Sequence, residues 1–213
     1  MGRSRTSYVY SNQLVKVDLF DASSTKNLLP FDGEVMYWPH FLAQKDAKTY
    51  FEYYHNSLVW KSDIIKIFGK TYITKRQVAW MGDADYGYSG NIHQKQSWDS
   101  QTLDLKLALE KKLSTSFNGC LFNLYPSGNE GMGWHADDEK ELGIHPVIAS
   151  ISLGAIRKFR FKHREKKVVI EQILEPGSLL VMQGKTQTYW LHELPKTKKV
   201  LHPRINLTFR RVY

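Results

Sequence analysis

The chain has 213 residues, 42% of them hydrophobic and 13% aromatic, which suits one folded domain and excludes a mainly disordered protein. Its single cysteine, Cys120, excludes a disulfide framework and a cysteine-rich zinc module. The net charge is +9, and residues 155–213 concentrate it, with 14 basic and 4 acidic side chains; this indicates either a polyanionic partner or a solvated basic face.

Residues 1–33 show no strong period, and we interpret them as a loosely docked arm of unknown role before a domain at 34–213. The first residues lack the apolar stretch of a secretory signal, and no later run is long enough to cross a bilayer. We therefore expect an intracellular protein, in the cytoplasm and nucleoid or in the nucleus according to the organism.

Two helices are predicted in the first half of the chain. One amphipathic segment follows Trp38-Pro39 and extends to Leu58, and Asp99 is placed to cap a second helix that extends to Leu113. Between them, residues 64–68 favour a short strand, and glycine, serine and aspartate favour a loop over 81–90.

After Cys120 the pattern changes to short apolar and β-branched runs separated by turn residues. The predicted strands are 120–125, 147–153, 158–161, 168–174, 178–182, 188–191 and 205–212. Strands without intervening helices are typical of an antiparallel sandwich or jelly roll. We expect an α+β protein in which the N-terminal helices pack against this β core.

His135 and Asp137 follow a glycine-rich stretch, and residues two apart on an extended segment point the same way. His192 is a candidate third ligand from a later strand. Two histidines and one carboxylate on one face form the facial triad of non-haem Fe(II) oxygenases. On these residues alone, two ordinary surface or core histidines remain the alternative.

The C-terminal strand carries a polar face. Alternation places Arg204, Asn206, Thr208 and Arg210 on one side and apolar residues on the other. Two guanidinium groups suit a dicarboxylate, because each can bind a carboxylate in a bidentate manner. A basic edge strand at the surface is the alternative.

Together these motifs resemble the AlkB family of Fe(II)- and 2-oxoglutarate-dependent dioxygenases, and the resemblance covers roughly residues 64–212. The pair Asn123 and Tyr125, ahead of the metal segment, is similar to the family's Asn-x-Tyr. The resemblance implies a double-stranded β-helix, the antiparallel jelly roll, with Fe(II), 2-oxoglutarate and O₂ as cofactors. It assigns the iron to His135, Asp137 and His192, and the cosubstrate to Asn123, Tyr125, Arg204, Asn206 and Arg210.

Within the family, the chain most resembles members that act on duplex DNA. The resemblance implies a nucleotide-recognition lid at about 64–95, in which Phe68 is a wedge in the base stack, with Arg76, Tyr86 and Tyr88 as further contacts. Asp138 and Glu139 would accept hydrogen bonds from the exocyclic amine of the target base. An ordinary core phenylalanine, exposed tyrosines, and acidic groups that offset nearby cations are the alternatives.

Two basic clusters are candidate phosphate contacts. Lys196, Lys198 and Lys199 match the family's DNA-binding loop. The other cluster surrounds a hairpin whose turn is shorter than in the duplex-specific members; it consists of Arg157, Lys158, Arg160, Lys162, Arg164, Lys166 and Lys167.

The resemblance therefore predicts a DNA-repair dioxygenase that demethylates N1-methyladenine and N3-methylcytosine and releases formaldehyde, succinate and CO₂. We expect it to be a monomer, with no membrane partner, that acts on alkylated DNA. The alternatives are a demethylase of methylated RNA, a metal-free nucleic-acid binding module, and an oxygenase of proteins or small molecules, which no specific feature supports.

Overall fold

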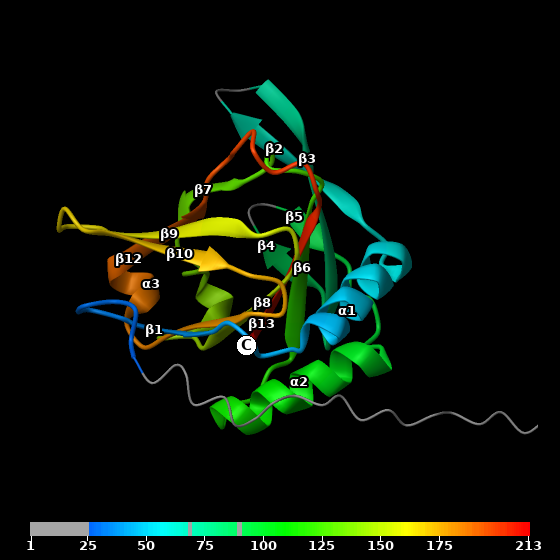
Figure 1. The fold of residues 1–213 in the computed structure, drawn as a ribbon, viewed down its shortest axis with the longest axis horizontal. Helices are drawn as coiled ribbons and strands as arrows, with labels where there is room; N and C mark the ends of the chain where they lie inside the picture. The colour runs from blue at the N-terminus through cyan, green and yellow to red at the C-terminus, as the bar shows by residue number, and fades with distance from the viewer. Residues whose placement is uncertain (1–25, 68–69, 89–90) are drawn as a thin grey trace, which may run out of the picture.

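A computed structural model describes residues 26–67, 70–88 and 91–213. Two antiparallel sheets dominate it (Figure 1). The large sheet has the order β1 (Glu34–Trp38), β11 (Leu179–Gln183), β8 (Ile148–Gly154), β13 (Arg204–Arg210), β6 (Gly119–Tyr125), β3 (Lys70–Gly82) and β2 (Lys61–Ile67). The small sheet has the order β10 (Val169–Leu174), β9 (Arg157–His163), β12 (Trp190–Leu194) and β7 (Met132–His135). A separate hairpin joins β4 (Tyr86–Tyr88) to β5 (Asn91–His93).

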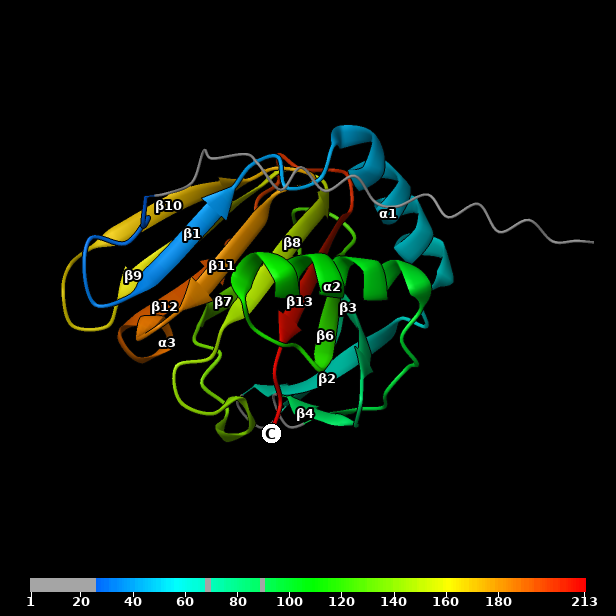
Figure 2. The same cartoon turned by 90° about the horizontal axis from the view of Figure 1, so that it is seen from below.

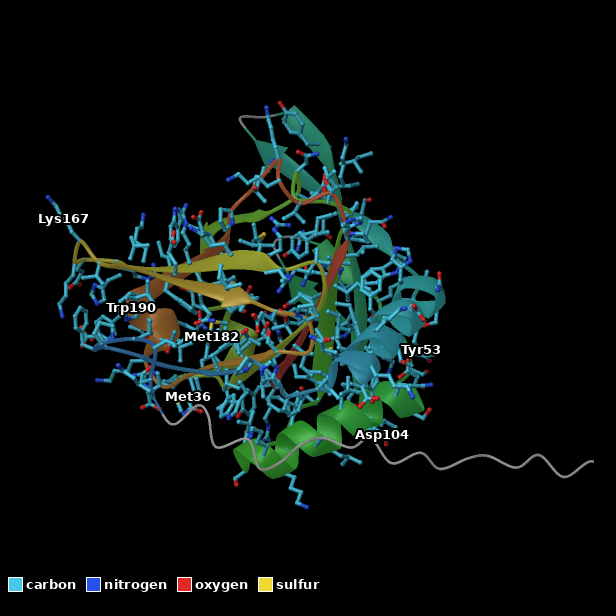
Figure 3. The ribbon with its side chains drawn as sticks, viewed as in Figure 1. Met36, Tyr53, Asp104, Lys167, Met182 and Trp190 are labelled. Atoms are coloured by element: carbon cyan, nitrogen blue, oxygen red, sulfur yellow. The ribbon has the colours of Figure 1, made fainter. Side chains whose placement is uncertain are left out.

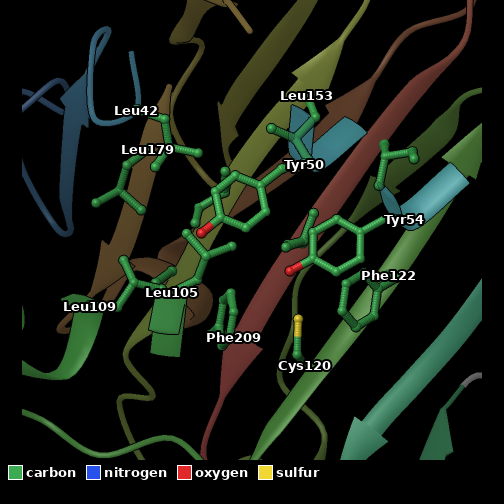
Figure 4. Packing of buried hydrophobic residues seen from close by; sticks show 14 of the residues in the cluster. Leu42, Tyr50, Tyr54, Leu105, Leu109, Cys120, Phe122, Leu153, Leu179 and Phe209 are labelled. Carbon is green, nitrogen blue, oxygen red and sulfur yellow. The ribbon is translucent and has the colours of Figure 1, made fainter. Parts of the chain in front are cut away.

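Helices α1 (Gln44–Ser57) and α2 (Ser100–Leu113) cover the outer face of the large sheet (Figure 2). Tyr50 and Tyr54 of α1 and Leu105 of α2 pack there against Phe122 and Phe209 of the sheet (Figure 4). Asp99 caps α2, since its side chain accepts a hydrogen bond from the backbone N–H of Thr102, as predicted. The predicted antiparallel core with packed helices is confirmed.

Strand β6 is buried along its whole length because it lies between the helices and the small sheet. Its alternate residues Cys120, Phe122 and Leu124 belong to the core under the helices. Asn123 and Tyr125 point to the opposite side, where they line an internal hollow. Because side chains alternate along a strand, one face of β6 packs in the core under the helices and the other face lines the hollow.

Three sequence predictions need correction. The helix predicted after Trp38-Pro39 begins only at Gln44, so Phe41 and Leu42 lie ahead of it. Residues 81–90 are not simply a loop, since they contain the end of β3 and strand β4. The expected strand at 188–191 begins only at Trp190, because the short helix α3 (Thr186–Tyr189) precedes it.

The described part of the N-terminal arm, residues 26–33, is docked onto the domain. Leu29 is buried, and the carbonyl of Phe31 accepts a hydrogen bond from the indole of Trp190 (3.1 Å). Asp32 forms an ion pair with Lys166 (2.9 Å), near the end of the β9–β10 hairpin, where Figure 3 labels the neighbouring Lys167. The arm's remaining residues, 1–25, lie outside the described chain.

None of the helices formed by the described residues is both long and apolar enough to cross a membrane.

Candidate active site

Six strands from the two sheets direct polar side chains into one hollow that is open to solvent on one side. The small sheet contributes His135 from the end of β7 and His192 from β12. The large sheet contributes the polar face of β13 and alternate residues of β6. Residues as far apart in the chain as Arg76 and Arg210 therefore face the same space.

His135, Asp137 and His192 form the only cluster of three potential metal ligands found in the described chain, with ligand atoms within 4.8 Å of one another. His192 lies directly opposite His135 in the β12–β7 pairing. Asp137 Oδ1 is 3.6 Å from Nε2 of His135 and 3.7 Å from Nε2 of His192. Sheet register therefore supplies the third ligand that sequence spacing could only suggest.

Hydrogen bonds orient this triad. Nδ1 of His135 lies 2.8 Å from the carbonyl of Gly133, a contact in which Nδ1 donates and Nε2 is left free to coordinate. The side-chain oxygen of Gln187 accepts a hydrogen bond from the backbone N–H of Asp137 (3.0 Å). Such supporting contacts fix the direction of metal ligands.

The electrostatics of the triad suit a cation. Burial alone would raise the pKa of Asp137, but Arg210, His192 and His135 together hold it below its usual value. Burial, reinforced by His135, lowers the pKa of His192 to about 3. At neutral pH the site therefore holds one carboxylate and a neutral His192 imidazole, a donor set that fits Fe(II).

Arg204 and Asn206 form the opposite wall with two serines of β8. Arg204 donates to Ser152 Oγ (2.8 Å) and to Asn206 Oδ1 (2.9 Å), and Ser150 Oγ donates to Asn206 Oδ1 (2.8 Å). Burial lowers the pKa of Arg204 to about 10, so the guanidinium is still charged at neutral pH. No carboxylate among the described residues forms an ion pair with Arg204. A buried cation is costly unless an anion binds it, so this wall fits a dicarboxylate such as 2-oxoglutarate.

Tyr125 and Asn123 complete this wall. The Arg204 guanidinium lies 5.5 Å from the Tyr125 ring, and Arg204 pairs with Tyr125 in the β13–β6 register. Asn206 pairs with Asn123 in the same register. The five residues expected to bind the cosubstrate therefore line the same hollow as the triad.

Arg76 lines the hollow, but its guanidinium is already engaged. It donates at 2.5 Å to Asp63 Oδ2 and at 2.5 Å to Asn123 Oδ1, and both side chains are buried. Arg76 therefore supports Asn123 from behind, and Asp63 compensates its charge. The expected contact of Arg76 with the substrate stays a prediction.

The expected base contact of Tyr86 needs correction. Its ring is 1% exposed and stacked on Trp80 at 4.5 Å, and its hydroxyl accepts a hydrogen bond from Arg210 (3.0 Å). A buried ring in this position has no free face for a base, so Tyr86 is a core residue that holds Arg210. The side chain of Tyr88 and the whole of Phe68 lie outside the described part of the chain.

The two acidic residues after Asp137 differ in surroundings. Asp138 is exposed and paired with Arg164 (3.0 Å). Glu139 is partly buried, and its Oε2 is buried with no hydrogen-bond partner among the described residues. Burial and then the neighbouring charge of Asp137 raise the pKa of Glu139.

Lys196, Lys198 and Lys199 are exposed on the loop between β12 and β13. The other basic cluster is mostly paired within the protein: Lys158 with Glu171, Arg160 with Glu193, Arg164 with Asp138, and Lys166 with Asp32. Arg157 is 2% exposed. It is therefore no phosphate contact in this structure.

Sequence reasoning missed several supporting residues. Ser150 and Ser152 alternate with apolar residues in β8, and this pattern could have indicated a second polar wall. Asp63 and Gln187 carried no such signal, since each acts through a contact between segments distant in the chain.

Comparison with known proteins gives a consistent result. The family model described as the 2OG-Fe(II) oxygenase superfamily matches residues 34–210. "Alpha-ketoglutarate-dependent dioxygenase alkB homolog 3" of Bos taurus is 37% identical over 185 residues, which cover 82% of this chain and 65% of that protein. The chain therefore spans just under two thirds of the length of this relative.

Two further relatives carry another name. "DNA oxidative demethylase ALKBH2" of Homo sapiens is 37% identical over 158 residues, covering 70% of this chain and 60% of that protein. The protein of the same name from Arabidopsis thaliana is 32% identical, covering 90% of this chain and 71% of that protein. Among solved structures, "The structure of OsALKBH1" superposes with a TM-score of 0.62 at 17% identity, covering 83% of this chain and 97% of that one, which shows a shared fold.

Proposed function

The chain belongs to the 2OG-Fe(II) oxygenase superfamily and, within it, to the AlkB homologues, and from that premise we propose that it is a DNA-repair dioxygenase. It would demethylate N-alkylated bases, with N1-methyladenine and N3-methylcytosine as substrates. This proposal rests on one observation: the His-Asp-His triad lines the same hollow as Arg204 and Arg210. We place this activity inside the cell, in the compartment that holds the genome.

His135, Asp137 and His192 would hold Fe(II), and Arg204 with Arg210 would hold the two carboxylates of 2-oxoglutarate. Bound together with O₂, these groups supply the oxidising chemistry. The chain's own contribution is position: Gln187 and Gly133 orient the metal ligands, and Tyr86 and Asp137 orient Arg210.

Glu139 supports an N-methylated base as the substrate. Methylation at N1 of adenine or N3 of cytosine makes the base cationic, and within the part of the chain that the structure describes the buried Oε2 of Glu139 has no hydrogen-bond partner. Asp138 would join it as an acceptor for the exocyclic amine after it exchanges its Arg164 contact for the base. Lys196, Lys198 and Lys199 would bind backbone phosphates.

Duplex DNA is the proposed form of the substrate, with Phe68 as the wedge that fills the gap left by a flipped base. Phe68→Ala should reduce repair of a duplex more than repair of a single strand. An equal loss on both substrates would contradict the wedge role. We propose that the protein acts as a monomer.

The test is a turnover assay with Fe(II), ascorbate and 2-oxoglutarate. Its substrates are matched single- and double-stranded DNA and single-stranded RNA, each with one N1-methyladenine, and mass spectrometry reports loss of the methyl group. Fast repair of the duplex is the expected result. Repair of RNA alone would favour the alternative RNA demethylase. Consumption of 2-oxoglutarate without base reversal would support the dioxygenase chemistry but contradict N-methylated bases as the substrate.

A further inference from the structure

Arg157, at the start of β9, is a buried cation that the proposed chemistry does not use. Its guanidinium donates to three backbone carbonyls: Ser127 (3.2 Å), Glu130 (2.9 Å) and Pro195 (2.9 Å). The first two lie between β6 and β7, ahead of His135, and the third lies between β12 and β13, ahead of the lysines. A single side chain therefore joins the two loops that flank the metal ligands.

The backbones of these two loops are also in direct contact. The N–H of Thr197 donates to the carbonyl of Gly128, and the N–H of Gly128 donates to the carbonyl of Val200, both at 2.7 Å. A Cβ on Gly128 would lie 2.2 Å from the carbonyl oxygen of Thr197, and one on Gly131 would lie 2.3 Å from that of Leu194. Glycine is needed here because of this close approach, and not for an unusual backbone angle.

Arg157 also reaches the cosubstrate wall. Its guanidinium lies 5.9 Å from the ring of Tyr125, and that of Arg204 lies 5.5 Å from the same ring. Tyr125 is thus in contact range of one arginine that faces the hollow and of another that ties the loops.

We propose that Arg157 is a positioning residue that holds the lysine loop, residues 195–200, in a phosphate-binding conformation by tying it to residues 126–131. The inference rests on the proposed function, because it takes nucleic acid as the ligand of Lys196, Lys198 and Lys199. A planar guanidinium group suits this task, since its N–H groups can donate to three carbonyl groups in fixed directions. The ammonium group of lysine has no such planar arrangement of donors. A loop held in place before binding loses less conformational entropy when it binds.

The decisive variant is Arg157→Lys, which keeps the charge and removes the fork. We expect it to bind a fluorescent single-stranded oligonucleotide roughly three- to tenfold more weakly than the unchanged protein. The slope of log affinity against log salt should be unchanged, because no phosphate contact is lost. Lys198→Gln should instead reduce that slope by about 0.7, the contribution of one phosphate contact on a single strand.

Hydrogen exchange tests the loops without any ligand. In Arg157→Lys, peptides that cover 126–131 and 195–200 should exchange faster, while peptides from α2 and β6 stay as in the unchanged protein. Gly128→Ala would push the same two loops apart where their backbones touch, with Arg157 intact. It should therefore give both the faster exchange and the weaker oligonucleotide binding. Arg211→Lys is the matched control, because that guanidinium is exposed and contacts only Ser116 Oγ among the hydrogen-bond partners found in the described chain.

Unchanged exchange and unchanged affinity in both Arg157→Lys and Gly128→Ala would overturn the proposal. A reduced salt slope in Arg157→Lys would also overturn it, because Arg157 would then be a direct phosphate contact. The two proposals fail separately. If the unchanged protein does not bind the oligonucleotide, the proposed function is wrong. If it binds, and both variants bind the oligonucleotide as tightly as the unchanged protein does, only the role of Arg157 is wrong.

Discussion

Nη2 of Arg210 lies 3.5 Å from Oδ2 of Asp137, so one buried ion pair joins strand β13 to the His-Asp-His triad. Tyr86 fixes the other side of the same guanidinium through its hydroxyl. The residue expected to bind the cosubstrate is therefore also the main neighbour that keeps the metal carboxylate ionised.

Removing this charge should move the pH range of metal binding. In Arg210→Gln, burial of Asp137 is no longer opposed by the guanidinium, so the pKa of Asp137 should rise. A proton then competes with the metal at higher pH. Titration with Co(II) between pH 4.5 and 7.5, without 2-oxoglutarate, should show a higher midpoint than in the unchanged protein; an identical midpoint would contradict the role of the ion pair.

His192 makes the metal-free protein sensitive to acid. Its pKa is about 3 in the folded state, against an ordinary 6.5. Between these values the unfolded chain binds a proton that the folded chain does not, so the free energy of unfolding falls as pH drops, by up to about 1.4 kcal/mol per pH unit. Urea unfolding from pH 7.5 to 4.5 should show a shallower fall for His192→Gln, whereas the exposed His202→Gln should keep the steep fall.

Arg204→Lys should separate cosubstrate binding from turnover. A lysine keeps the charge but loses the paired donors that face a carboxylate and the contacts to Ser152 and Asn206. We expect the KM for 2-oxoglutarate to rise about 10- to 100-fold, as for the loss of a charged hydrogen bond, with a much smaller change in kcat. A fall in kcat at unchanged KM would place Arg204 in another role.

Tyr86→Phe tests the reassignment of Tyr86 from the lid to the core. The ring still stacks on Trp80, but Arg210 loses a hydrogen-bond acceptor. We expect the free energy of unfolding to fall by about 1 kcal/mol and the affinity for a methylated single strand to stay the same. Weaker nucleic-acid binding at full stability would restore the base-contact role.

Asp63→Asn tests whether Arg76 is structural. The substitution leaves a buried guanidinium without its carboxylate, and loss of one partner of a buried pair typically costs about 3 kcal/mol or more. Thermal and urea unfolding should show that loss. The exposed pair Lys48–Glu52 offers a comparison, since Glu52→Gln should change stability by less than about 0.5 kcal/mol.

Much of the site could be predicted from local rules. The period-2 pattern of β13 places Arg204, Asn206 and Arg210 on the hollow side and Leu207 with Phe209 in the core, and the structure confirms this division. The His-x-Asp spacing likewise places two ligands on one extended segment. Such inferences succeed because they depend only on the geometry of a single strand.

Tertiary structure decided what depends on neighbours from distant segments. The pairing of His192 with His135 is a matter of sheet register, which no spacing along the chain determines. Tyr86 and Arg157 are of residue types that favour the surface or a ligand, yet both are buried, because Arg210 and three backbone carbonyls supply their polar partners. A polar side chain can be buried only where such partners exist, and here other strands and loops provide them.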